Sequence, residues 1–386
     1  MTARLSATLA EGMYRVTTPQ QTLARINPLL AEMGITRAAD ITGLDRLGIP
    51  TWCAIRPNAR QVQVANGKGL SHPAAKVSAL MEAIEHWHAE YTEGDVCAAS
   101  TATLVRDGVP HVALGELPDY EERVHLTDDR VVHWVRGESL VDGARVLVPA
   151  CAAYLIEPRF VHFSTNGLAS GNHVVEATLH GLYEVIERDA VSRLKRGGLL
   201  LPRGESRVID LDSVPAGPVA LLRDRLQRVG VQLVLIRVES IRPISTFWAV
   251  LLDSASPFAC SYVNMGHGSH LSPTVAAIRA ITEAAQSRLT FIQGSREDLW
   301  EESYEFGETH TRVYSFFERQ RGDLSWDHIA DHASGDLLQD LETVVSGLVS
   351  AGYTRGYRTE LTSARVGIPV VKVLVPGLLN ATHQAR

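Results

Sequence analysis

Apolar residues along the chain recur at helical spacing in some stretches and alternate or run together at strand spacing in others. Helical spacing predicts helices over residues 21–33, 74–91, 175–195, 274–292 and 338–351. Strand spacing predicts strands within residues 49–64 and 131–156, and over 231–239, 245–253, 354–361 and 368–376. Because helices and strands do not alternate strictly, the pattern indicates an α+β fold.

Three polar stretches interrupt this pattern. Residues 66–69 (Asn-Gly-Lys-Gly) predict a tight turn, because glycine is enriched in turns. Residues 266–270 begin like a dinucleotide-binding fingerprint but lack its third glycine, so they predict a loop. Residues 298–340 are polar and acidic and predict an excursion on the surface.

Three of the predicted helices share one pattern of residue types. The segments that begin at Ala75, Ala177 and Ala276 each continue with a polar residue three positions on, then a small and an aliphatic residue, and then a glutamate. These glutamates are about one hundred residues apart in the sequence. That period is too long for a solenoid, so it indicates three copies of one helix in a larger pseudo-symmetric unit.

Each of these helices would carry one polar ridge, since positions i, i+4 and i+7 share a face. The ridges are Ser78, Glu82 and Glu85; His180, Glu184 and Glu187; and Arg279, Glu283 and Gln286. The opposite faces are apolar, and small residues beside the ridges (Ala75, Ala79, Gly181 and Ala280) would allow a close approach. For one helix alone a solvated face is the simpler interpretation. Three copies in register, with Lys76 as their only lysine, disfavour it.

If the ridges converge, they bring together the four carboxylates of Glu82, Glu85, Glu184 and Glu187. Like-charge repulsion then requires cations. A set of oxygen ligands selects hard ions, and Mg²⁺ is commonly shared between carboxylates and phosphates. Arg279 and Arg288 would contact the phosphate oxygens.

Composition limits the classes of protein to which the chain can belong. With 386 residues, of which 45% are hydrophobic, it can bury one core or two. A formal net charge of −7 disfavours a dedicated nucleic-acid binder, which needs a basic surface. The N-terminus lacks the apolar region of a signal peptide, and no apolar run approaches the ~20 residues of a membrane helix. We therefore expect a cytoplasmic protein without a membrane segment.

The four cysteines, Cys53, Cys97, Cys151 and Cys260, lie far apart and form no CxxC pair. Two disulfides are one use of an even number, but a chain of this length does not need them. Free, buried thiols in a reducing compartment are the expectation.

The motifs resemble those of the YcaO family over nearly the whole chain. SALMEAIEH resembles the family's Sx3ExxER motif, with Ser78, Glu82 and Glu85 matching and His86 in place of the usual arginine. TNGLASG and then LYEVIERDA resemble a second block through Asn166, Gly167, Gly171, Glu184, Glu187 and Arg188. ITEAAQSRLTFIQGSRED resembles a third block through Glu283, Gln286, Arg288 and the GSR of residues 294–296.

The resemblance implies a YcaO-type fold of pseudo-repeated helix-on-sheet units with an ATP site between helices. It implies a helical N-terminal segment, residues 1–48, packed on a catalytic domain of residues 49–386. The implied Mg²⁺ ligands are Glu82, Glu85, Glu184 and Glu187. The residues implied to face ATP or its phosphates are Lys68, Ser71, Ser78, Asn166, His180, Arg188, Arg279, Glu283, Gln286 and Arg288. Lys68 lies in GKG, which is similar to the family's glycine-flanked lysine but lacks the spacing of a Walker A loop. The catalytic base stays unassigned.

The resemblance also implies a reaction on a peptide substrate. A nucleophile adds to a backbone amide carbon, ATP phosphorylates the resulting oxygen, and phosphate leaves. A neighbouring Cys, Ser or Thr side chain would give an azoline, whereas external sulfide would give a thioamide.

Two features favour the thioamide. The C-terminus, LVPGLLNATHQAR, lacks the PxPxP tail common in azoline-forming members. The runs TPQQTLARINPLL and GITRAADITGLDRLGIP resemble members that work beside TfuA, a partner associated with sulfur delivery. An azoline-forming cyclodehydratase, a non-catalytic ATP-binding scaffold protein and a ligase that forms acyl phosphates are the alternatives. For the oligomeric state, a homodimer stays open.

Overall fold

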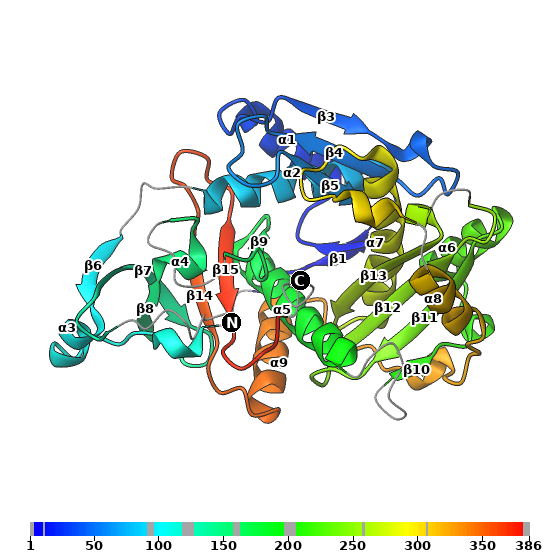
Figure 1. The fold of residues 1–386 in the computed structure, drawn as a ribbon. Helices are drawn as coiled ribbons and strands as arrows, with labels where there is room; N and C mark the ends of the chain where they lie inside the picture. The colour runs from blue at the N-terminus through cyan, green and yellow to red at the C-terminus, as the bar shows by residue number, and fades with distance from the viewer. Residues whose placement is uncertain are drawn as a thin grey trace.

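The computed structural model of the chain describes residues 4–10, 12–90, 96–117, 127–156, 163–196, 206–256, 259–305 and 308–380. Its helices and strands form the α+β fold that the sequence predicts (Figure 1). The expected helix end at Tyr91 and the last residues of the C-terminal tail, 381–386, lie outside the described residues. Within the described part of the chain, no helix combines the length and hydrophobicity that crossing a bilayer requires.

Three strand-helix units organise the fold. They are β5 (Val64–Lys68) with α2 (His72–Ala89), β9 (Leu168–Ser170) with α5 (Val174–Arg196), and β13 (Val263–His270) with α7 (Pro273–Gln293). Each helix packs on the sheet that contains the strand before it. This is the repeated helix-on-sheet unit that the sequence predicts (Figure 1).

The three units lie on separate sheets, whose named strands all pair antiparallel. The other strands of these sheets are β3 (Arg37–Asp40), β4 (Thr51–Ile55), β6 (Cys97–Ser100), β7 (Val131–Ser139), β8 (Arg145–Pro149), β10 (Ser206–Val208), β11 (Gln232–Val238), β12 (Ser245–Leu252), β14 (Tyr357–Glu360) and β15 (Val370–Leu374). The helix α2 lies on β3-β4-β5, and α7 lies on β10-β11-β12-β13. The helix α5 lies on β6-β7-β14-β15-β9, to which β8 is added beside β7.

Shorter elements complete the described chain. An N-terminal hairpin pairs β1 (Thr8–Ala10) with β2 (Met13–Arg15). The remaining α-helices are α1 (Pro19–Ile26), α3 (Thr101–Arg106), α4 (Ala150–Ala153), α6 (Pro218–Arg228), α8 (Glu308–Glu318) and α9 (Leu337–Ser350). The apolar faces of α2, α5 and α7 are buried in three hydrophobic clusters, as the helical pattern predicts.

Glycine lets two of the helices lie unusually close to the strands before them. A Cβ atom added to Gly67 of β5 would lie 1.9 Å from the backbone nitrogen of Ala79. A Cβ atom added to Gly268 of β13 would lie 2.1 Å from the carbonyl oxygen of Ala276. Both distances are far inside van der Waals contact, so neither position has room for a side chain. The predicted turn at residues 66–69 and loop at 266–270 are therefore wrong, because most of these residues belong to strands under a helix.

Three further expectations differ from the structure. The predicted helix over residues 21–33 ends at Ile26 and continues only as a 3-10 turn, because Pro28 cannot donate a helical hydrogen bond. The stretch 298–340 is more than a surface excursion, since Phe317 and Trp326 are buried in the core. The expected boundary after residue 48 falls between two paired strands of one sheet, β3 and β4.

A buried ion cluster joins the N-terminal part of the chain to α7. Arg288 Nε lies 2.8 Å from Asp45 Oδ2, and Arg288 Nη1 lies 3.0 Å from Asp253 Oδ2. These three side chains are each less than 5% exposed. Arg46 adds a second cation, 2.7 Å from Asp253 Oδ1. Arg288 thus neutralises two buried carboxylates.

We predict that Gly67→Ala destabilises the protein by at least about 2 kcal/mol, because the new methyl group must displace helix backbone. Gly43→Ala is the matched control, since a Cβ atom there meets nothing within 4 Å. We expect it to change stability by no more than about 0.5 kcal/mol. Urea unfolding measures both, and equal stability of the two variants would contradict the close packing.

We predict that Arg288→Met costs about 3–5 kcal/mol, because it leaves buried carboxylates without their cation. Arg365→Met removes an ion pair to Glu32 from an arginine that is 64% exposed, and should cost less than about 1 kcal/mol. The measurement is again the free energy of unfolding. A stability of Arg288→Met close to that of Arg365→Met would disprove the structural role.

Candidate functional site

The three polar ridges face one cavity of about 630 Å³. All nine ridge residues line it: Ser78, Glu82 and Glu85 from α2; His180, Glu184 and Glu187 from α5; and Arg279, Glu283 and Gln286 from α7. The ridges therefore converge, as the repeat predicts. Residues about one hundred positions apart in sequence become neighbours because each strand-helix unit turns its ridge inward.

Glu82 and Glu85 of α2 and Glu184 of α5 lie in an environment that opposes their ionisation. Burial, and then neighbouring carboxylates, raise the pKa of Glu82 to about 7 and that of Glu85 to about 8. Burial raises the pKa of Glu184 as well, and Glu187 adds to this rise. Glu187 is buried, and its Oε2 has no hydrogen-bond partner. A cation placed among these oxygens would remove the repulsion and satisfy the free lone pairs.

This arrangement fits Mg²⁺ that is shared with a phosphate. Among the described residues, no three His, Cys, Asp or Glu side chains are close enough together to enclose an ion alone. Mg²⁺ commonly takes only one or two carboxylates from a protein and completes its shell with water and phosphate oxygens. Glu85 already has a fixed orientation, because its Oε1 accepts hydrogen bonds from Ser170 N at 2.8 Å and Ser170 Oγ at 2.6 Å.

Cationic side chains line the cavity beside the carboxylates. Lys68 Nζ lies 2.7 Å from Glu283 Oε2. Burial alone would raise the pKa of Glu283, but Lys68, His267 and Arg188 together outweigh burial and hold this pKa well below the usual value. Arg188, Arg279 and Arg296 also line the cavity. The site thus holds positive charge suited to phosphate as well as negative charge suited to a metal ion.

His180 lies in an environment that favours its neutral form. Burial, followed by the charges of Arg279, Arg15 and Lys68, lowers its pKa well below the usual value. Its Nδ1 lies 3.3 Å from Arg279 Nη1. Because arginine only donates, Nδ1 accepts and the ring proton resides on Nε2.

Most residues that the sequence proposed for the ATP site line the cavity, namely Lys68, Ser78, His180, Arg188, Arg279, Glu283 and Gln286. Three do not. Ser71 caps α2 by accepting a hydrogen bond from Ala74 N. Asn166 lies in the turn before β9, where its neighbour Thr165 reaches the cavity. The expectation for Arg288 is wrong, because its guanidinium is held away from the cavity by Asp45 and Asp253.

One departure from the expected motifs, His86, lies at the cavity. His86 lines it and is buried, and burial lowers its pKa to about 4, so it brings no charge. Arg296, in the loop after α7, is a cation that acts on Glu82. Burial raises the pKa of Glu82, and the charge of Arg296 offsets part of that rise.

The cysteines lie elsewhere. None of the four forms a disulfide, and none is among the described residues that line the cavity. Cys53 and Cys151 are buried as expected, whereas Cys97 is exposed, so the expectation of buried thiols is wrong there.

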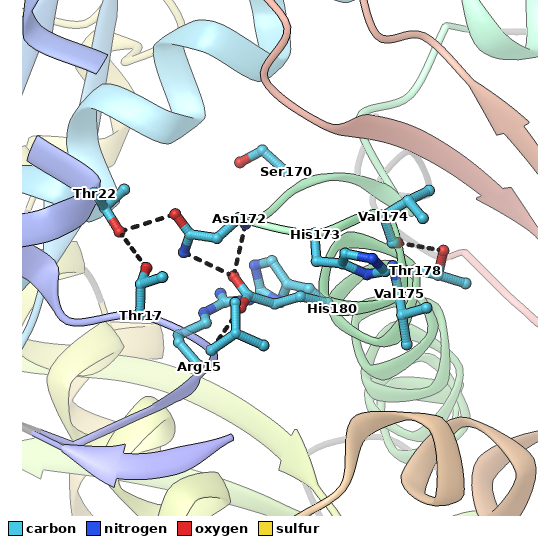
Figure 2. Close-up of polar contacts among 12 residues, drawn as sticks. Arg15, Thr17, Thr22, Ser170, Asn172, His173, Val174, Val175, Thr178 and His180 are labelled. Carbon is cyan, nitrogen blue, oxygen red and sulfur yellow. Dashed lines mark hydrogen bonds and ion pairs between the residues drawn. The ribbon is translucent and has the colours of Figure 1, made fainter. Parts of the chain in front are cut away.

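Sequence reasoning missed the contribution of the N-terminal segment. Arg15 and Thr22 line the cavity together with Asn172 and Glu176 of the second unit. Figure 2 shows Arg15, Thr22, Asn172 and His180 around one point. No spacing rule links residues that lie some 150 positions apart in the chain, as Thr22 and Asn172 do. A buried glutamate in the first turn of α5 was the one available signal.

Comparison with known proteins identifies the family. A family model described as YcaO cyclodehydratase, ATP- and Mg²⁺-binding, matches residues 66–379. A protein of Mycobacterium tuberculosis is 35% identical over 383 residues, 95% of this chain and 83% of the relative. A protein of Rhizobium leguminosarum bv. trifolii, described as lying in the tfuA 3′ region, is 34% identical over 97% of this chain and 91% of the relative.

A solved structure has the same fold. YcaO from Methanopyrus kandleri, described as bound with AMPPCP and Mg²⁺, matches with a TM-score of 0.78 at 23% identity, over 97% of this chain and 94% of that chain. Three observations point to the same family: the matches in sequence, the shared fold, and a cavity that combines carboxylates with cations. The chain belongs to the YcaO family of ATP- and Mg²⁺-binding enzymes.

Proposed function

We propose that this enzyme uses ATP to phosphorylate a backbone amide oxygen of a peptide and so installs a thioamide. Sulfur would come from an external donor or from a TfuA-like partner protein. The observation that carries the thioamide is the relative in the tfuA 3′ region, which is similar over 97% of this chain.

The cavity suggests a role for each group of residues. Glu82, Glu85, Glu184 and Glu187 would hold Mg²⁺, and Lys68, Arg15, Arg188 and Arg279 would contact phosphate. His180, through Nε2–H, would donate a hydrogen bond to the nucleotide, whereas the Nε2 of Gln286 already donates to Asn66 O at 2.7 Å. ATP supplies the phosphoryl group that makes the amide oxygen a leaving group. Bound Mg²⁺ would neutralise the charge that develops on the transferring phosphoryl group.

The position of the cysteines favours an external nucleophile. No described residue lining the cavity is a cysteine, so a protein thiol is not placed to attack there. Sulfide adds to the amide carbon, forming the C–S bond, and the oxygen accepts the γ-phosphoryl group of ATP. The C–O bond then breaks, the oxygen departs as phosphate, and a thioamide and ADP remain.

The alternative is azoline formation, which the description of the family model as a cyclodehydratase favours. In that reaction the substrate's own Cys, Ser or Thr side chain attacks the amide carbon from a near-attack geometry. The ATP chemistry is the same. The two reactions differ in the source of the nucleophile, and for that reason one gives a thioamide and the other an azoline.

We predict that Glu82→Gln, Glu184→Gln and Glu187→Gln each weaken Mg²⁺-dependent ATP binding or lower turnover by roughly 10²–10³-fold, because a group that stabilises developing charge is lost. Isothermal titration with and without Mg²⁺ and an assay of ADP release provide the measurements. Glu239→Gln, in an exposed ion pair with Arg242, is the control and should behave as wild type. Wild-type ATP affinity and turnover in two of the three variants would refute the metal-site assignment.

We predict a sulfide-dependent gain in peptide mass that matches the exchange of oxygen for sulfur. The enzyme, a TfuA-like protein, Mg-ATP, sulfide and candidate peptides are incubated, and peptide mass and ADP are measured with sulfide present or omitted. ADP should accompany modified peptide, because each phosphorylated oxygen leaves as phosphate. A sulfide-independent loss of water at Cys, Ser or Thr would instead establish azoline formation.

A further inference from the structure

One wall of the cavity comes from residues 12–22, here called the N-terminal strap. Gly12, Met13, Tyr14, Arg15 and Thr22 of the strap line the cavity. The strap lies outside residues 66–379, the part of the chain that the family model matches. The cavity is thus completed by a segment that must be held against the family core from outside.

Glu176 of α5 is the residue that holds the strap at the cavity. Its side chain is only 2% exposed. Its Oε2 accepts a hydrogen bond from Val16 N at 2.9 Å, and its Oε1 lies 3.5 Å from Arg15 Nη1. Asn172 extends the contact, since its Oδ1 accepts a hydrogen bond from Thr22 Oγ1 at 3.0 Å (Figure 2).

Helix capping explains only part of this geometry. Glu176 lies in the first turn of α5, and its Oε1 accepts hydrogen bonds from Asn172 N at 3.0 Å and Asn172 Nδ2 at 3.2 Å. These are local contacts that any capping glutamate could make. The contact of Oε2 spans 160 residues of sequence and fixes the strap backbone directly beside Arg15. Oε2 therefore binds the strap backbone, whereas Oε1 contacts both the start of the helix and the guanidinium of Arg15.

The strap has independent anchors at its other end. Tyr14 Oη donates to Asp340 Oδ2 at 2.9 Å and accepts from Gly335 N at 2.7 Å. Before the strap, Ala7 N donates to Gly335 O at 3.1 Å. Loss of the Glu176 contact would therefore leave the strap attached, while the Arg15 guanidinium would lose its fixed partner.

We propose that Glu176 is a positioning residue of the nucleotide site, which acts by orienting Arg15 of the strap toward the phosphates of ATP. This inference rests on the proposed function only in taking the bound anion to be a nucleotide phosphate. An arginine side chain has many rotamers, and a buried carboxylate partner limits them before the nucleotide arrives. Arg15 then meets the phosphate with little loss of entropy.

The test uses the full chain and Mg-AMPPCP as the probe. Glu176→Gln keeps the shape of the side chain but removes the charge that orients Arg15, and we expect roughly tenfold weaker binding. Glu90→Gln is the matched control. Glu90 is also a largely buried carboxylate, which binds the guanidinium of Arg56 and accepts a hydrogen bond from the backbone N–H of Arg60. Unlike Glu176, it is not among the residues that line the cavity. It should lose stability yet bind the probe as wild type does.

A double-mutant cycle separates positioning from a general loss of structure. If Glu176 acts through Arg15, Glu176→Gln should add almost nothing to the binding defect of Arg15→Met. Additive defects, or wild-type affinity in Glu176→Gln, would overturn the proposal while leaving the proposed function intact. Failure of the wild-type protein to bind Mg-AMPPCP would overturn both.

Hydrogen exchange in the wild-type protein gives a test that needs no variant. Mg-AMPPCP should slow exchange at the Val16 amide, which is bonded to Glu176, and leave the Ala7 amide at the outer anchor unchanged. Equal exchange at Val16 with and without the probe would count against the proposal, even if Glu176→Gln did not fold.

Discussion

The cavity of this enzyme depends on how closely helices approach the strands that precede them. Gly67 and Gly268 leave no room for a side chain between strand and helix, and Ala79 and Ala276 are the small residues on the opposing helix. A bulkier residue on either side would push the helix outward and with it the polar ridge on its inner face. On α5 the small residue is on the helix itself, since a Cβ atom at Gly181 would lie 3.0 Å from a carbonyl oxygen of the neighbouring chain segment. Close packing is therefore what sets the distance between the ridges.

Electrostatics gives that cavity its chemistry. Burial, and after it the neighbouring carboxylates, raise the pKa values of Glu82, Glu85 and Glu184, so a cation bound among them would stabilise their ionised forms. Lys68 and Glu283 form an ion pair on the side of α7. Arg188 acts on Glu184 and Arg296 acts on Glu82, each opposing the rise in the pKa of that glutamate, so cations and carboxylates lie close together in the cavity. Binding of Mg-ATP would bring both kinds of partner at once.

Two arginines of α7 illustrate how position decides role. Arg279 and Arg288 are nine residues apart on the same helix, and Arg288 lies within the third motif, which begins two residues after Arg279. Arg279 faces the cavity and contacts His180, whereas Arg288 is enclosed by Asp45 and Asp253. Arg288 links the N-terminal part of the chain to the core through Asp45. A second link lies at the cavity, where Glu176 of the core binds the strap. Ionic contacts thus tie the N-terminal segment to the family core at these two points and at the exposed pair of Glu32 and Arg365.

The sequence by itself determined the repeat, the three helices, their polar and apolar faces and the carboxylate set of the cavity. It could do so because helical periodicity is local and is visible within a dozen residues. Tertiary structure alone decided that the glycine-rich stretches are strands, since their glycines are explained by a helix above them and not by a turn. It alone decided that Arg288 is structural and that Arg15, Thr22 and Glu176 join the site. Those assignments depend on contacts between residues more than a hundred positions apart, such as Arg288 with Asp45 and Val16 with Glu176. No periodicity in the chain encodes such pairs, because only the packing of one unit on another brings them together.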